Sequence, residues 1–334
     1  MPIRARTVAS QVKWITPRLL SLQTDSNDLV VICVVRNGQE HLKGFIDHHR
    51  KIGAKYIVFL DNNSTDLTIE LAQQQSQGDV ILLKCDLQYG RYRDEFKYWL
   101  AQTFGSGCWC LIADIDERFD FPYSNLIKLS SFLQYLNSYK YSGVYLQMVD
   151  LFADKSILDW PTIENIEERS LWYDHTNIFI DPNTATRDTA LGNKETNSNI
   201  KALWGGIRKA IFNVEKLQTK QTLLFPSRGA YPISPHWIKN ADLADVSCAL
   251  FHYAFDNTFP KRCEEIVRRN SHWSNSIEYR NYLLKINQMG DELTLKTSSA
   301  KKLSGINDLV DDGYLIVSEQ YMMYVKSILN TGRT

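Results

Sequence analysis

The first 120 residues alternate between continuous apolar runs and amphipathic segments, and this alternation constrains the fold more than any other feature. The apolar runs, rich in β-branched residues, predict strands buried on both faces at 28–35, 55–60, 79–84 and 108–114. The amphipathic segments between them predict helices at 40–53, from 64 or 65 to about 75, and at 91–104. Because strands and helices alternate, we expect an α/β fold with a mostly parallel sheet and helices on both faces.

After residue 120 the alternation fades. Further strands are predicted at 142–153, 201–212 and 246–255, a mobile loop at the polar, turn-rich stretch 181–200, and helical structure at 260–290. No linker or internal repeat interrupts the chain, so we expect one domain with a C-terminal elaboration. Its predicted parts are an N-terminal arm (1–27), a first half of the sheet (28–120), a second half (121–258) and a helical, aromatic C-terminal segment (259–334).

The charge balance and the hydropathy argue against a global nucleic-acid-binding field, although a local basic patch stays possible, and against a membrane span. The 334 residues include 38 Lys and Arg and 38 Asp and Glu, so no global basic field would attract nucleic acid. No apolar stretch reaches the roughly 18 residues of a membrane span, and the basic N-terminus lacks the apolar core of a signal peptide. Arg4, Arg6, Lys13 and Arg18 could touch an anionic membrane surface, but an arm packed on the domain is the expected arrangement. The six cysteines lie in apolar contexts and are expected to be reduced core residues of a cytoplasmic protein.

Polar side chains gather where the predicted strands end, which is the edge where parallel sheets bind ligands. The fourth apolar run ends in Asp114, Asp116 and Glu117. Residues two apart on a strand point to the same side, roughly 7 Å apart, so Asp114 and Asp116 would repel unless a cation or hydrogen-bond donors compensate. Carboxylate oxygens select Mg²⁺ or Mn²⁺. A solvated acidic turn is the alternative, because a bare D-x-D sequence is common.

The other strand ends carry weaker signals. Asp61, after the second strand, could accept hydrogen bonds from a base or ribose, whereas residues 63–66 suit a plain strand-to-helix turn. Arg36 and Asn37, after the first strand, could flank a nucleotide or begin the next helix. The chain has no G-x-G-x-x-G and no G-x-x-x-x-G-K-[ST] pattern, so it lacks the phosphate loops of dinucleotide-binding folds and of P-loop enzymes.

These strand-end motifs resemble those of the GT-A glycosyltransferases, in particular the branch similar to glycosyltransferase family 2. The motifs are, in chain order, "VVRNGQEHL" at 34–42, "DNNSTD" at 61–66 and "DIDE" at 114–117. Four later motifs resemble the same family less specifically: "WGGIRKAIF", "SPHW", "LFHYAF" and "HWSNSIEYRNY". They are similar to the family 2 subgroup whose D-x-D runs on into Glu, and to the related family 92. Together the motifs cover about residues 28–285.

The resemblance implies a GT-A fold whose nucleotide-sugar half is 28–120 and whose acceptor-side half is 121–258. It also implies a nucleoside-diphosphate sugar donor, with UDP the expected nucleotide, Mn²⁺ or Mg²⁺ as cofactor, and inversion at the anomeric carbon. The implied acceptor is a glycan or lipid-linked glycan of a bacterial surface polysaccharide or lipopolysaccharide. The implied nucleotide-sugar residues are Arg36, Asn37, Asp61, Arg93, Lys97 and Asp114, and the implied metal ligands are Asp114, Asp116 and His252.

A direct displacement needs a general base near the acceptor oxygen. Many relatives carry an acid after a G-G-F-type loop, but "WGGIRKAIF" has none. The candidates are Asp150, at the end of the strand that follows the D-x-D, and His236 in "SPHW"; a strand-end turn and a stacked residue are their structural alternatives. Structural roles are expected for the remaining histidines, His41, His48, His49, His175 and His272.

Other functions stay open. A haloacid-dehalogenase-type phosphatase also uses D-x-D, but on the first strand, and with Thr or Val where Arg118 stands. A sugar-nucleotide pyrophosphorylase needs a Gly-rich, basic loop after the first strand, and "RNGQEHL" is not one. A catalytically inactive carbohydrate-binding or scaffold relative is a further alternative, against which the intact Asp114, Asp116 and His252 argue. Peripheral contact with the inner face of the cytoplasmic membrane also stays open, and the sequence indicates no oligomeric state.

Overall fold

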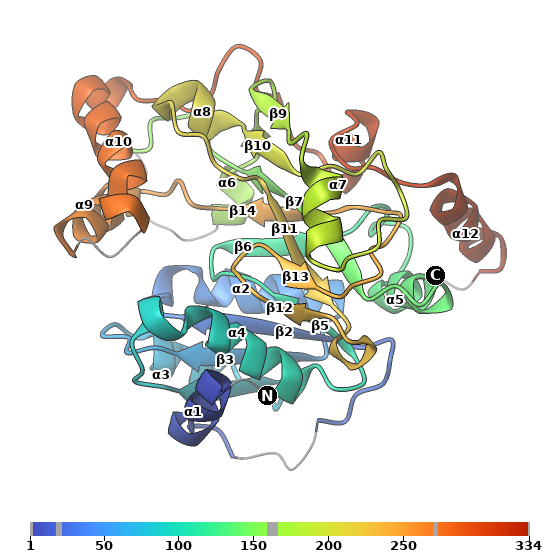
Figure 1. Ribbon diagram of the computed structural model, residues 1–334. Helices are drawn as coiled ribbons and strands as arrows, with labels where there is room; N and C mark the ends of the chain where they lie inside the picture. Colours follow the sequence, from blue (N-terminus) through green and yellow to red (C-terminus); the bar gives the residue numbers. More distant parts are fainter. Residues whose placement is uncertain (1–2, 18–21, 159–165, 270–272, 333–334) are drawn as a thin grey trace.

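A nine-stranded sheet forms the centre of the computed structural model, which describes residues 3–17, 22–158, 166–269 and 273–332 (Figure 1). Arg18 and His272 therefore lie outside the described residues. The strand order is β1-β4-β3-β2-β5-β11-β7-β14-β6. Because β1, β11 and β6 each pair antiparallel with their neighbours, the other six strands share one direction. The expected α/β class with a mostly parallel sheet is confirmed at this level.

The strands of this sheet are β1 Lys13–Trp14, β2 Leu29–Val35, β3 Tyr56–Asp61, β4 Val80–Lys84, β5 Trp109–Ile112, β6 Glu117–Asp120, β7 Gly143–Asp150, β11 Thr219–Leu224 and β14 Cys248–His252. Three two-stranded sheets pair β8 Trp172–Tyr173 with β15 Lys301–Lys302, β9 Ile178–Ile180 with β10 Leu203–Gly205, and β12 Tyr231–Pro232 with β13 Ile238–Lys239. The helices are α1 Ile3–Gln11, α2 Gln39–Ile52, α3 Thr68–Gln75, α4 Tyr89–Phe104, α5 Leu129–Ser138, α6 Ile166–Arg169, α7 Thr184–Ala190, α8 Ile207–Phe212, α9 Phe259–Arg269, α10 Trp273–Met289, α11 Ile306–Asp311 and α12 Glu319–Asn330. Short 3₁₀ turns span Pro226–Arg228 and Gly290–Glu292.

The continuous apolar run of β2 is explained by burial on both faces of the sheet. Val31 belongs to a core cluster that contains Phe45 of α2, together with residues of α3, α5 and α12. Val30 and Ile32 belong to a second cluster, with Phe96 of α4 and residues of α1. Because successive strand residues point to opposite faces, a strand covered by helices on both sides needs apolar residues throughout.

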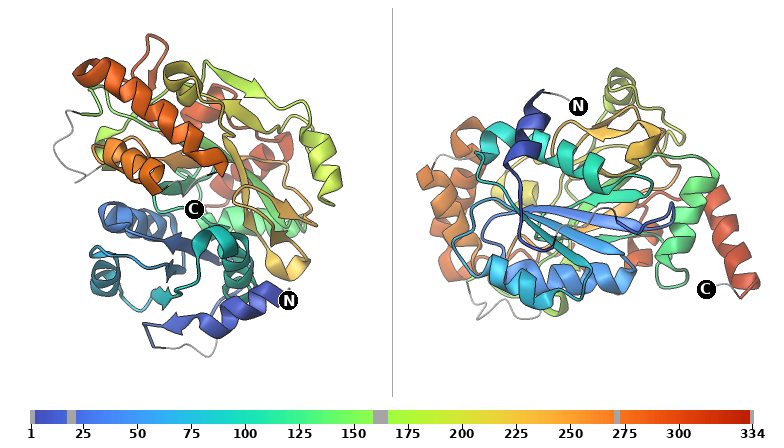
Figure 2. Two further views of the ribbon diagram at one scale, coloured as in Figure 1. Left: turned by 60° about the vertical axis from the view of Figure 1, so that its left-hand side comes forward. Right: turned by 90° about the horizontal axis from the view of Figure 1, so that it is seen from below.

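The last helix of the C-terminal segment, α12, packs beside α5 (Figure 2). Tyr321 of α12 is fully buried, its ring lies 5.8 Å from that of Phe132 in α5, and its hydroxyl donates to the carbonyl of Pro122 at 2.8 Å. By contrast, α8, α9 and α10 form a separate aromatic cluster in which Phe212 and Phe259 pack on Tyr282. The chain end therefore stabilises two different parts of the molecule.

The prediction of a mobile loop at 181–200 is wrong, because this stretch contains α7 and binds the sheet. The Tyr145 hydroxyl donates to the buried carboxylate of Asp188 at 2.5 Å, and Gln221 of β11 donates to the same carboxylate at 2.9 Å. Asn193 donates to the carbonyl of Ile238 at 3.1 Å. The polar side chains that suggested a loop are the partners of polar groups in β7, β11 and β13.

The strand predicted at 201–212 is only partly correct. It ends at Gly205, and α8 begins at Ile207. Gly205 and Gly206 have φ values of 97° and 69°, a region that glycine tolerates and that ends a strand. A Cβ added to Gly205 would lie 2.2 Å from the carbonyl oxygen of Asn177, so the turn also requires the missing side chain.

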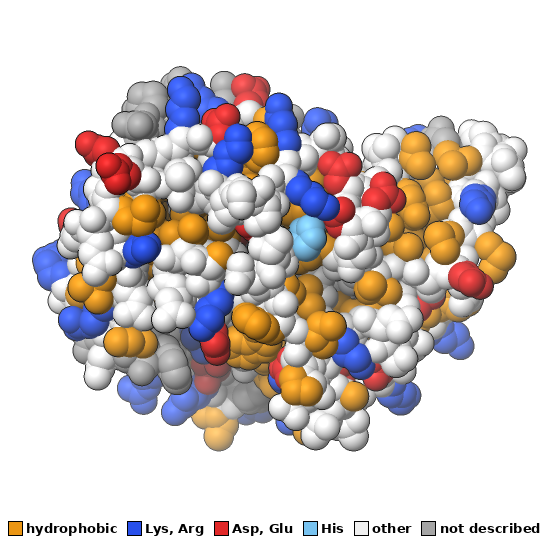
Figure 3. Space-filling view, turned by 90° about the horizontal axis from the view of Figure 1, so that it is seen from above, with side chains coloured by type: hydrophobic (Ala, Val, Ile, Leu, Met, Phe, Trp, Pro, Cys, Tyr) orange, Lys and Arg blue, Asp and Glu red, His pale blue; other side chains and the backbone are white. Residues whose placement is uncertain are grey.

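The N-terminal arm packs on the domain. Ala5 and Val8 of α1 are buried, and Val8 joins the core cluster of α4. Among the residues described, no helix combines the length and hydropathy needed to cross a membrane. All six cysteines are buried and free. Acidic and basic side chains are interspersed on the face seen in Figure 3, as the zero net charge suggests.

Candidate functional site

The strand order β3-β2-β5 places the predicted strand-end residues next to one another. Asn37, at φ 54°, links two of these ends, because its side-chain oxygen accepts from the backbone N–H of Thr65 at 2.8 Å and its own N–H donates to the Ser64 hydroxyl at 2.9 Å. Ser64 and Thr65 are thus occupied outside a helix, so α3 begins at Thr68 rather than at 64 or 65. Arg36, beside Asn37, is exposed.

Asp61 ends β3 and is completely buried. Both of its carboxylate oxygens lie 3.3 Å from the backbone N–H of Ser64. The residues after β3 therefore form the strand-to-helix turn that the sequence allowed, and they hold the Asp61 carboxylate at the carboxyl end of the sheet.

The D-x-D does not continue the fourth strand. β5 ends at Ile112, residues 114–116 form a turn, and Glu117 begins β6. The expectation that Asp114 and Asp116 face the same way as neighbours on a strand is wrong, because the two carboxylates contact different groups. The turn is closed by Glu117, whose carboxylate accepts from the backbone N–H of Asp114 at 2.9 Å.

Asp114 belongs to a group of two lysines and two carboxylates. The Lys220 ammonium on β11 lies 2.7 Å from Asp114 Oδ2 and 2.6 Å from Glu117 Oε1, and Lys97 of α4 lies 3.4 Å from Asp114 Oδ1. Lys220 and Lys97 are both about 3% exposed at the side chain. Burial alone would raise the pKa of Asp114, but Lys220 and Lys97 outweigh it and hold that pKa well below its usual value.

Asp116 faces a second buried network. His252, at the end of β14, presents Nε2 3.3 Å from Asp116 Oδ2 and Nδ1 2.6 Å from Asp150 Oδ1. Arg208 of α8 donates to both oxygens of Asp150 at 2.8 Å. Burial alone would lower the pKa of His252, but the carboxylates of Asp116 and Asp150 outweigh it and raise that pKa to about 9.

The side chains around Asp116 offer two ligands to a divalent cation, a carboxylate and an imidazole. A pKa of about 9 means that both ring nitrogens of His252 carry protons at pH 7, so Nδ1 donates to Asp150 Oδ1 at 2.6 Å and Nε2 donates to Asp116; Nη2 of Arg208 also lies 2.8 Å from Nδ1. A divalent cation that displaced the Nε2 proton would find that nitrogen and Asp116 Oδ2 as neighbouring ligands. A histidine oriented by a carboxylate through its other nitrogen is the usual arrangement of a metal-binding histidine. Among the described residues, no group of three His, Cys, Asp or Glu side chains is arranged to hold an ion.

The candidate bases differ in availability. Both oxygens of Asp150 are taken by Arg208 and His252, and its side chain is only 4% exposed. His236 lies between β12 and β13, and its Nδ1 is 2.8 Å from the carbonyl of Thr219, which assigns that nitrogen a proton and leaves Nε2 as an acceptor. Burial and the nearby Lys220 lower the pKa of His236 to about 3, so the ring is neutral at pH 7.

Arg93 lies on the same helix as Lys97. Arg93 forms an ion pair with Asp94 at 2.9 Å, and its side chain is 42% exposed. Both oxygens of the Asp94 carboxylate accept from this guanidinium. Of the two residues predicted on α4, Lys97 is buried at the D-x-D turn, whereas Arg93 is more exposed.

Three buried cations of the site were not predicted from the sequence. Lys220 stands in "TKQTLL", and a lysine inside a buried strand is the one signal that could have identified it. Arg208 is in the segment mistaken for a strand. Arg118 is completely buried and donates to the backbone carbonyls of Ile115 and Glu117, which fixes the D-x-D turn from behind.

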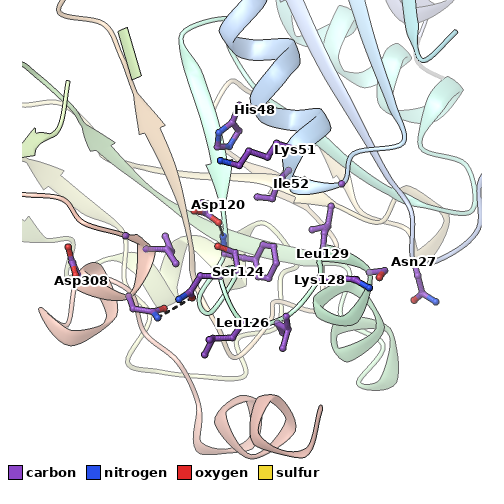
Figure 4. Close-up of a pocket in the computed structure, with 18 of the residues that line it drawn as sticks. Asn27, His48, Lys51, Ile52, Asp120, Ser124, Leu126, Lys128, Leu129 and Asp308 are labelled. Carbon is purple, nitrogen blue, oxygen red and sulfur yellow. Dashed lines mark hydrogen bonds between the residues drawn. The ribbon is translucent and has the colours of Figure 1, made fainter. Parts of the chain in front are cut away.

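A large cavity lies at the other edge of the sheet, away from this site. It has a volume of about 910 Å³ and is lined by residues before β2, at the end of α2, after β6 and at the start of α11. Figure 4 shows His48, Lys51 and Ile52 of α2 above Asp120 and Ser124, with Lys128 and Leu129 beside them.

No family model matches the chain, and the comparison with curated proteins found no match. Among solved structures, the chain is similar to one described as the crystal structure of HddC from Yersinia pseudotuberculosis, with 12% identity and a TM-score of 0.25. The match covers 38% of this chain and 64% of that chain, so this chain spans less than two thirds of its length. A likeness at this level does not show a shared function.

Proposed function

We propose that the chain is a metal-dependent glycosyltransferase with a GT-A fold. It would move a sugar from a nucleoside-diphosphate sugar, with UDP the expected nucleotide, to a hydroxyl of a glycan or lipid-linked glycan acceptor. The observation that carries the proposal is the pair Asp116 Oδ2 and His252 Nε2, 3.3 Å apart at the ligand edge of the sheet. Once the proton between them is displaced, this nitrogen and this carboxylate oxygen would be two ligands of a cation, with the histidine oriented by Asp150.

Asp116 and His252 would hold the cation, Mn²⁺ or Mg²⁺. When bound, the ion offsets the negative charge of the departing diphosphate. Asp150 orients His252, and Arg208 neutralises Asp150 from the other side. In this proposal Asp150 is a positioning residue rather than the general base, because its oxygens are already occupied.

Asp114 would act beside the cation rather than through it. Its carboxylate is held by Lys220 and Lys97, and it remains 42% exposed. A carboxylate fixed in this way can accept hydrogen bonds from a ribose or sugar hydroxyl. Asp61 ends β3, on the far side of β2, and is completely buried, so it would reach a ribose only if the turn after β3 moved. Arg36, exposed at the end of β2 between them, is available to the nucleotide.

His236 would be the base. In a direct displacement, the acceptor oxygen forms a bond to the anomeric carbon as the bond from that carbon to the diphosphate oxygen breaks, and the acceptor proton passes to His236 Nε2. The low pKa of His236 in the free protein makes it a weak base. The negative charge of a bound donor would raise that pKa toward the working range.

The test is a melting-temperature panel of UDP, GDP, CMP and TDP, each with and without Mn²⁺ or Mg²⁺, with uridine as the control that lacks phosphates. A ligand at about 100 times its Kd adds about 2.7 kcal/mol to the free energy of unfolding, which raises the melting temperature by several degrees. We expect UDP to do so only with metal, and uridine to do nothing. Unchanged melting temperatures across the panel would count against a nucleotide-sugar enzyme. Binding without any turnover of donor would favour the inactive carbohydrate-binding relative.

A further inference from the structure

His41 is a buried histidine that the proposed site leaves without a role. It is the third residue of α2 and is 5% exposed. Its Nε2 lies 3.0 Å from Asp256 Oδ2, and Arg262 donates to both oxygens of this fully buried carboxylate, at 2.9 and 2.7 Å. Because the carboxylate can only accept, Nε2 of His41 carries a proton.

The other ring nitrogen of His41 has no partner. Nδ1 is buried and makes no hydrogen bond within the described part of the chain. A buried polar atom left in this state costs about 1–3 kcal/mol, so such atoms nearly always have a partner. The missing partner is then a group that the described protein atoms do not supply.

The surroundings of His41 connect it with the D-x-D turn. The guanidinium of Arg118 donates both to the backbone carbonyl of His41, at 3.1 Å, and to that of Ile115, at 2.9 Å. Gly38, one turn earlier, lies so close to this turn that an added Cβ would be 3.0 Å from Ile115 Cγ1. α2 therefore begins directly against the residue that separates Asp114 from Asp116.

The partner of His41 approaches the same turn from the other side. Asp256 follows β14, and three residues before it the N–H of Tyr253 donates to the carbonyl of Asp116 at 2.9 Å. The arrangement repeats that of His252, in which a ring nitrogen contacts a buried aspartate and an arginine holds that aspartate. Such pairs fix the orientation and tautomer of histidines at metal sites.

We propose that His41 is a further residue of the cation site, in which its Nδ1 lone pair accepts a hydrogen bond from the hydration shell of the divalent cation held by Asp116 and His252. Mg²⁺ loses its waters reluctantly and usually keeps several, so groups outside the direct ligands contribute to its binding. The inference rests on the cation site of the proposed function.

The experiment measures the Kd of Mn²⁺ for the full chain without nucleotide, from the electron paramagnetic resonance signal of free Mn²⁺. His41→Gln keeps an amide where Nε2 contacts Asp256 but removes the acceptor at Nδ1, whereas His41→Asn keeps a polar atom near Nδ1. The matched control is His49→Gln, on the same helix and completely buried. Urea unfolding curves establish that each variant is folded.

We expect the Mn²⁺ affinity to fall about 10–100-fold in His41→Gln, as for other groups that support metal ligands, to recover in part in His41→Asn and to be unchanged in His49→Gln. An unchanged affinity in a folded His41→Gln would overturn the inference and leave the proposed function standing. Unchanged Mn²⁺ affinity with weaker UDP binding would also overturn it, because His41 would then contact the diphosphate. If the wild type bound no Mn²⁺ at all, the cation site itself would fail, and the inference with it.

Discussion

Replacing Lys220 by Met tests the buried charge network that fixes the D-x-D turn. Lys220 lies 2.7 Å from Asp114 and 2.6 Å from Glu117, and Glu117 is only 1% exposed. Met has a similar length and suits the buried strand, so the change removes the charge with little loss of volume. The Glu117 carboxylate then remains buried without its cation. Removal of one partner from a buried ion pair costs about 3–5 kcal/mol, and we expect a loss of that size in the free energy of unfolding.

The assay is urea denaturation at pH 8 and at pH 5, together with the double variant Lys220→Met/Glu117→Gln. Burial raises the pKa of Glu117 and Lys220 opposes that rise, so the pKa is higher still in Lys220→Met. A folded-state pKa raised above the unfolded value gives stability at low pH that is lost as pH rises. The loss in Lys220→Met should therefore be smaller at pH 5 than at pH 8, and Glu117→Gln should restore part of it. The reasoning would be refuted if Lys220→Met reduced the free energy of unfolding by less than about 1 kcal/mol at pH 8, or by the same amount at pH 8 and pH 5.

Two further predictions concern the rest of the fold. Burial raises the pKa of Asp120 to about 6, so the ionisation of Asp120 destabilises the folded protein as pH rises through that value. Asp120→Asn should therefore increase the free energy of unfolding by up to about 2–3 kcal/mol at pH 8 and by much less at pH 4. Equal gains in melting temperature at both pH values would contradict this. Gly205→Ala should reduce the free energy of unfolding by about 1–3 kcal/mol or more, because φ is 97° and the new Cβ would lie 2.2 Å from a carbonyl oxygen. The matched control is Gly107→Ala, where φ is 79° but the space around the glycine is open. Urea unfolding should show a smaller loss for this control.

The first half of the fold could be predicted because its signals are local. Each apolar run of β2 to β5 reports burial on both faces, and the helices between them carry their own periodicity. Asp61, Asp114 and Asp116 follow from the rule that ligands bind at the carboxyl ends of parallel strands. The fine geometry did not follow, because the break between β5 and β6 depends on Glu117 folding back on the backbone N–H of Asp114.

The second half could not be predicted in the same way, because its strands join the sheet out of chain order. β11 inserts between β5 and β7, and this alone brings Lys220 to Asp114, 106 residues earlier. Periodicity holds no information about such pairings. The contacts of Arg208 with Asp150 and of His41 with Asp256 likewise depend on tertiary structure, so a helix histidine with no motif around it was expected to be structural.

The central claim is that Asp116 holds a cation that a nucleotide-sugar reaction requires. The most direct measurement is the release of UDP from UDP-sugars, with Mn²⁺ present, by the wild type, by Asp116→Asn and by Asp47→Asn, an exposed aspartate of α2 paired with Lys43. We expect the wild type to release UDP and Asp47→Asn to release it at the same rate. The rate of UDP release by Asp116→Asn should be at least about 100-fold lower, although this variant remains folded. Two results would contradict the account: UDP release by Asp116→Asn at the wild-type rate, or UDP release by the wild type that is equally fast with and without Mn²⁺.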